Sequence, residues 1–163
     1  RLLQTYHIIA LLRSASRRVG DRSVELMVVD PRLREKTEEH WGNLIVRYVK
    51  SLPRHEFLKL LTSADLYIER CIDEELRMSS VEAGLLGIPI AKLTHPKFVA
   101  RQDYDDEIKW SYSPKGLVDA LANYMANVEY WKSYYAKKLR NFLATRRNWD
   151  SVKEPLVSFL KAS

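Results

Sequence analysis

The sequence predicts an α/β domain with a doubly wound parallel sheet, in which helices cover both faces, and with a helical C-terminal end. Three observations predict this class. Short apolar runs alternate with helical patterns over residues 1–93, each run lies beside polar or turn-forming residues, and the chain after residue 113 is helical in pattern. Such alternation is typical of βαβ units. The length of 163 residues is that of one domain.

The predicted strands are four short apolar runs, bounded by residues that favour turns. Asp30-Pro31 ends the first run, and Gly87 precedes the fourth. The runs span residues 23–29, 43–49, 65–68 and 88–93. We expect all four to lie parallel in one buried sheet, with right-handed crossovers between them.

The predicted helices carry apolar side chains at helical spacing, or begin at a residue that favours a helix start. Gly20-Asp21 ends the first helix, and Pro53 stands where the third begins. The helices are expected over residues 1–18, 32–40, 53–61, 79–86, 115–126, 129–144 and 151–162.

The net charge of +6 favours anionic partners. Much of the excess lies in the last third of the chain, at Lys132, Lys137, Lys138, Arg140, Arg146 and Arg147. A solvated helix face is the expected explanation, with no nucleic acid as partner. A peripheral contact with an anionic membrane surface is the alternative left open. No apolar run approaches the ~20 residues that span a bilayer.

The cysteine and histidine content argues against a disulfide and a metal centre. Cys71 is the sole cysteine, which excludes an internal disulfide and fits a reducing compartment, so a cytoplasmic location is expected. The four histidines do not stand at metal-ligand spacing. The acidic run over 103–107 is read as a solvated loop. We therefore expect no metal.

The loop after the third strand is the candidate site, because ligands of such sheets lie beyond the carboxyl ends of the strands. The helix that follows the loop starts with Ser79-Ser80, and its free N–H groups and dipole favour phosphate. One turn further on, the Glu82 carboxylate can accept hydrogen bonds from a vicinal diol. Glu74, at the loop tip, can meet the polar end of the same ligand. The pattern suits a nucleoside diphosphate that carries a polyhydroxyl group.

These residues resemble the motif of the C-terminal, donor-binding domain of GT-B glycosyltransferases, above all the retaining family called family 4 or group 1. That family has Glu-x7-Glu-Ala followed by Gly-x-Pro and a hydrophobic residue. This chain has Glu74, Glu82-Ala83 and Gly87-Ile88-Pro89-Ile90 at those places. Supporting similarity covers nearly the whole chain, through residues 24–29, 46–49, 56–68 and 148–152.

The resemblance implies a Rossmann-like fold, half of a GT-B fold, and a role for each motif residue. Glu74 would contact the donor sugar as the catalytic-site acid, and Glu82 would hold the ribose hydroxyls. Further donor contacts would come from Arg77, Met78, Ser79 and Ser80 to the sugar and diphosphate, and, by position only, from Tyr48, Val49 and Lys50 to the base. The nucleotide-diphosphate sugar would be the substrate, with no separate cofactor. The base, the sugar, the acceptor and the oligomeric state stay open.

The chain also departs from the family pattern. Glu75-Leu76-Arg77 stands where Gly-Phe-Gly is usual, and Leu85 replaces a small residue. The family's first strand of this domain, with its phosphate clamp, and the acceptor domain are expected ahead of Arg1. We therefore expect residues 1–163 to be one nucleotide-sugar-binding domain of a two-domain retaining glycosyltransferase, inactive when isolated. A sugar-nucleotide epimerase of the same architecture and a non-catalytic basic α/β interaction module are the alternatives.

Overall fold

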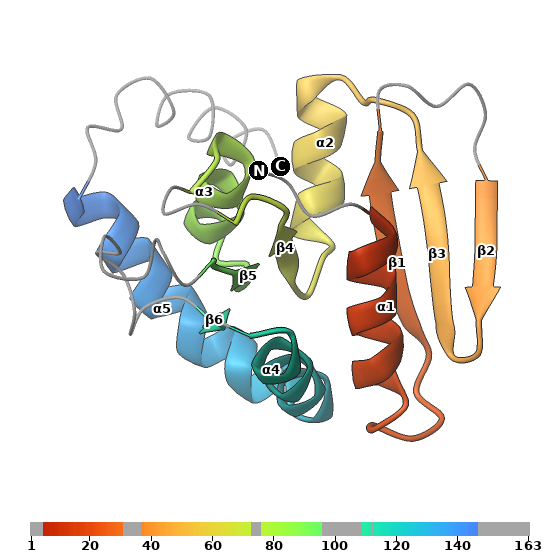
Figure 1. The fold of residues 1–163 in the computed structure, drawn as a ribbon. Helices are drawn as coiled ribbons and strands as arrows, with labels where there is room; N and C mark the ends of the chain where they lie inside the picture. Colours follow the sequence, from red (N-terminus) through yellow and green to blue (C-terminus); the bar gives the residue numbers. More distant parts are fainter. Residues whose placement is uncertain (1–4, 31–36, 73–75, 96–108, 112, 147–163) are drawn as a thin grey trace.

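The computed structural model describes residues 5–30, 37–72, 76–95, 109–111 and 113–146, and it is a mixed α/β arrangement (Figure 1). The elements in chain order are α1 (Thr5–Ser16), β1 (Val24–Val29), β2 (Thr37–Trp41), β3 (Leu44–Val49), α2 (Arg54–Thr62), β4 (Tyr67–Glu69), α3 (Met78–Leu85), β5 (Ile90–Leu93), β6 (Lys109–Ser111), α4 (Pro114–Ala126) and α5 (Val128–Arg146). The four predicted strands and the helices matching α1 to α5 are confirmed. The helix expected over 151–162 lies outside the described residues.

The described strands form two three-stranded sheets, where the sequence predicts one. The first sheet has the order β1-β3-β2 and the second β4-β5-β6. β1 and β3 are parallel, as are β4, β5 and β6. Within the described residues, no hydrogen-bonded pairing joins the two sheets. Parallel pairing is thus confirmed, and the single doubly wound sheet stays a prediction.

The helix expected over 32–40 is wrong where the structure describes it. Residues 37–41 form β2, which pairs antiparallel with β3 through a hairpin at Gly42-Asn43. Gly42 has a φ of +71°, a conformation that favours glycine, and this permits the tight turn. The polar character of this segment led to the helix prediction. On this edge strand the charged side chains are satisfied across the sheet, since Glu38 accepts from Arg47 Nε at 2.7 Å.

Two hydrophobic clusters cover opposite faces of the second sheet. α2 and α3 pack on one face, through Leu58, Leu61, Leu76, Val81, Ala83, Ile88 and Ile90. α1 and α4 supply the other cluster, with Ile8, Ile9, Leu12, Ala15, Leu44, Val46, Ala91, Leu117, Val118 and Leu121. Ile90 and Ala91 fall in different clusters because successive strand side chains point to opposite faces. Leu44 and Val46 lie on β3, so the first sheet also contributes to this second cluster.

The polar side chain of Asn43 locks the first sheet to the end of α1. Its amide nitrogen donates to the carbonyls of Ser16, Gly20 and Arg22 at 3.1, 3.1 and 3.0 Å. Its carbonyl oxygen accepts from the Ser16 hydroxyl at 2.9 Å. The hairpin turn thereby satisfies backbone groups left open where α1 ends, as buried helix ends require.

Candidate functional site

The best-defined polar feature is the carboxylate of Glu82, on the second turn of α3. Its side chain is 1% exposed, yet it is ionisable. Oε1 is paired with Nη2 of Arg54, the first residue of α2. Oε2 is buried with no hydrogen-bond partner in the described part of the chain. Leaving a buried acceptor without a partner costs free energy, so this oxygen calls for an explanation beyond packing.

A second buried carboxylate, Glu69, organises the loop that leads into α3. It is the last residue of β4 and is 3% exposed. Its Oε1 accepts the Cys71 N–H at 2.9 Å, and its Oε2 accepts the Arg77 N–H at 3.3 Å. Oε2 also accepts the hydroxyl of Ser80, which is fully buried. Glu69 therefore binds groups at the start of α3, close to where the sequence predicts a diphosphate.

The other residues at the start of α3 differ in how open they are. Arg77 is the N-cap, with no side-chain capping hydrogen bond, and its Nε lies 2.8 Å from the sulfur of Cys71. Met78 is exposed. The Ser79 hydroxyl lies 2.7 Å from that of Tyr67. Burial raises the pKa of Tyr67, so its phenol is neutral and can donate. The hydroxyls of both serines are thus engaged within the protein.

The carboxyl end of β5 adds buried polar groups that the sequence reasoning did not single out. Lys92 is fully buried and pairs in register with Glu69 on the neighbouring strand. Residues in register on adjacent strands project to the same face, so an ammonium and a carboxylate face the same side. The hydroxyl of Thr94 is buried with no partner in the described residues. The carboxyl ends of β4 and β5 therefore carry buried polar side chains.

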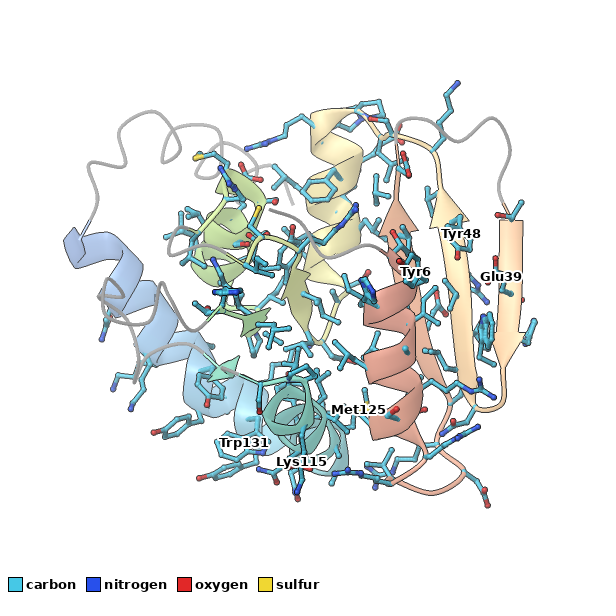
Figure 2. All side chains as sticks on the ribbon, viewed as in Figure 1. Tyr6, Glu39, Tyr48, Lys115, Met125 and Trp131 are labelled. Atoms are coloured by element: carbon cyan, nitrogen blue, oxygen red, sulfur yellow. The ribbon has the colours of Figure 1, made fainter. Side chains whose placement is uncertain are left out.

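The residues predicted to hold the base lie at the end of β3. Tyr48 packs against the α1-side cluster, and burial together with Glu39 raises the pKa of its phenol. Figure 2 shows Tyr48 and Glu39 on the neighbouring strands β3 and β2, with Tyr6 on α1 nearby. Val49 is half-buried and Lys50 is exposed. In the described part of the chain, no hydrogen bond or ion pair joins these three to Glu82, whereas Arg54, four residues beyond Lys50, is joined to it.

The structure thus brings together part of the predicted site. Arg77, Met78, Ser79, Ser80 and Glu82 share the start of α3. Glu74, the predicted catalytic acid, lies outside the described residues. The roles of all these residues in donor binding stay predictions.

Arg54 and Glu69 were not among the residues predicted from the sequence. Both could have been found by topology, because Glu69 ends a strand and Arg54 begins the helix after one, at the ligand end of a parallel sheet.

The basic C-terminal helix α5 carries exposed aromatic side chains beside lysines. Tyr130 and Tyr134 are exposed and stacked, with centroids 6.2 Å apart, and Lys138 Nζ lies 4.7 Å from the Tyr134 ring centroid. Lys132 is paired with Asp65 at 2.9 Å. Figure 2 shows Trp131 far from Tyr48 in that view.

The described residues include neither a candidate membrane span nor a candidate metal cluster. None of the described helices is both long and apolar enough to cross a membrane. No group of three or more His, Cys, Asp or Glu in the described ranges could hold a metal ion.

The fold of the chain is similar to that of a solved structure. The chain matches, over its whole length, the solved structure described as "Structural basis for EarP-mediated arginine glycosylation of translation elongation factor EF-P". The TM-score is 0.58 and the sequence identity 16%. The chain spans 58% of the length of that structure's chain. No family model and no curated protein sequence matches the chain. At this identity the likeness shows the fold alone, an α/β arrangement similar to that of the matched structure.

Proposed function

We propose that this chain is the donor-binding domain of a nucleotide-sugar-dependent glycosyltransferase that retains configuration. The observation that carries the proposal is Glu82, whose buried Oε2 has no partner in the described residues. The Glu-x7-Glu resemblance assigns the same residue to the ribose hydroxyls. The fold likeness to a protein that mediates arginine glycosylation supports the reaction class. Retention of configuration rests on the motif resemblance alone.

The donor would lie across the start of α3. A ribose hydroxyl would donate to Glu82 Oε2 and replace the missing partner. The diphosphate would meet the exposed rim at Arg77 and Met78, since the Ser80 hydroxyl is held by Glu69. The N–H groups and dipole of α3, with the Arg77 guanidinium, would stabilise charge on the departing diphosphate. Glu74 would contact the sugar.

The proposal includes a complete sheet and a second domain. A strand that pairs with both β1 and β4 would join the two described sheets into one doubly wound sheet, in the strand order of dinucleotide folds. The acceptor would bind between this domain and its partner domain. Transfer by the whole protein, a cytoplasmic location and the absence of a metal are parts of the same proposal.

The test is a calorimetric titration of the chain with UDP, GDP and ADP. We expect one of them to bind, and Glu82→Gln to weaken it by about tenfold, the effect of losing one charge-assisted hydrogen bond. Glu129→Gln, an exposed glutamate on α5, is the matched control and should bind as the unaltered chain does. Failure of all three nucleotides to bind would overturn the proposal and favour a basic interaction module. Binding that is indifferent to Glu82→Gln would overturn the assignment of the ribose contact.

A further inference from the structure

We propose that Arg54 is the positioning residue that makes Glu82 selective for nucleotides with a ribose hydroxyl. The inference rests on the proposed function and adds a residue that the motif does not contain. It concerns how Glu82 discriminates between ligands, rather than whether the domain binds a nucleotide.

The first step is the geometry of the Glu82 carboxylate. Its two oxygens have unequal surroundings, since Oε1 is paired with Arg54 Nη2 while Oε2 has no partner in the described residues. An ion pair at one oxygen restrains rotation of the carboxylate and fixes the direction in which the other oxygen points. A fixed acceptor rejects a ligand that lacks the matching donor, because the buried oxygen is then left unsatisfied.

The second step is charge. Glu82 is 1% exposed, and a carboxylate at such a place needs a nearby positive charge to stay ionised. A diphosphate bound close by would add repulsion. Arg54 offsets both effects, and its side chain is 53% exposed, so it lies at the boundary between the buried carboxylate and solvent.

The third step is the position of Arg54 in the chain. It is the first residue of α2, directly after Pro53 and four residues beyond Lys50, where the base is predicted to lie. The Arg54–Glu82 pair therefore ties the start of α2 to the second turn of α3. Arg77, at the start of α3, places its Nε 2.8 Å from the sulfur of Cys71.

The experiment compares ribose and deoxyribose forms of the nucleotide that binds in the titration above. Affinities are measured by calorimetry for the diphosphate and for its 2′-deoxy and 3′-deoxy forms. The proteins are the unaltered chain, Arg54→Met, Arg54→Lys and the control Arg18→Met. Arg18 is a matched control because it is an exposed arginine paired with a carboxylate, that of Asp119, far along the chain from α3.

The unaltered chain should prefer the ribonucleotide to at least one deoxy form by about tenfold. Arg54→Met should reduce that preference to about twofold or less, Arg54→Lys should restore part of it, and Arg18→Met should leave it unchanged. General damage to the fold would weaken the binding of the ribonucleotide and of both deoxy forms by the same factor, so the ratio of their affinities would not change.

Three results would overturn the inference. An unchanged ratio in Arg54→Met would remove the positioning role while the proposed function stands. Equal binding of the ribonucleotide and both deoxy forms by the unaltered chain would show no selectivity for a ribose hydroxyl. That result would also remove the positioning role of Arg54. Failure of the unaltered chain to bind any of the nucleotides would overturn the inference and the proposed function together.

Discussion

Replacing Arg54 by methionine should destabilise the fold more than its half-exposed position suggests. The substitution keeps most of the side-chain length but removes the charge. The carboxylate of Glu82 is then left without an ion-pair partner. Its side chain is only 1% exposed, and its Oε2 has no hydrogen-bond partner in the described residues, so neither water nor the protein compensates the charge. Removing one member of a buried ion pair costs about 3–5 kcal/mol, mainly because the other charge stays uncompensated. Since Arg54 is itself half exposed, solvent screens part of the pair, and we expect a loss of about 2–3 kcal/mol.

The assay is urea unfolding at neutral pH, with the free energy of unfolding compared at equal slope. Arg18→Met removes a pair in which both side chains are about half exposed, so it should cost less than about 1 kcal/mol. Arg54→Met should also lower the melting temperature by about 4–10 °C for a domain of this size. The double variant Arg54→Met/Glu82→Gln should recover part of the loss, because it leaves no buried charge. A loss in Arg54→Met no larger than in Arg18→Met would refute this reasoning.

Two further predictions concern the frame around the site. Asn43→Ala should lower the free energy of unfolding by about 2–3 kcal/mol, because three backbone carbonyls lose their donor. The control Asn123→Ala removes an exposed side chain and should change the free energy of unfolding by less than about 0.5 kcal/mol. Equal losses in the two variants would contradict this prediction. Burial raises the pKa of Tyr124, so its stabilising contribution is complete below about pH 10 and is lost as the pH rises above that value. Tyr124→Phe should flatten the alkaline decline in melting temperature, while the exposed Tyr130→Phe should not; identical profiles would count against the pKa shift.

The parts of the fold with strong local signals were predictable from the sequence. α4 begins at Ser113-Pro114, whose serine hydroxyl accepts from the Gly116 N–H at 3.0 Å, and a cap with proline in the first turn can be read directly from sequence. β1, β3, β4 and β5 were predicted from short apolar runs, which are also local signals. Hydrophobic periodicity and helix capping depend on residues a few positions apart, so both can be recognised from the sequence alone.

What the sequence did not reveal depends on contacts between distant residues. The residues of β2 are all exposed, and Glu38 is paired with Arg47 on the neighbouring strand, a contact that a local sequence pattern does not indicate. β6 lies next to a run of acidic residues, and its pairing with β5 was also missed. The helix expected over residues 32–40 was wrong for this reason.

The candidate site shows the same division. Glu82 and the serines of α3 were singled out from the order of strand, loop and helix together with the motif resemblance, and their roles toward a ligand stay predictions. The pairing of Glu82 with Arg54 spans 28 positions in sequence, and that of Glu69 with Ser80 spans 11, so both needed the fold. Glu69 also changes the chemistry expected at α3, because it engages a hydroxyl that had been assigned to the ligand.

The most direct measurement of the central claim is a map of backbone amide shifts by ¹H–¹⁵N NMR as UDP, GDP and ADP are added in turn. Our account predicts that one nucleotide perturbs the amides of Arg54 and of residues 77–82, and that Glu82→Gln reduces those changes at the same concentration. Perturbation confined to α5, near Tyr134 and Lys138, would contradict the account, and so would the absence of any change with all three nucleotides.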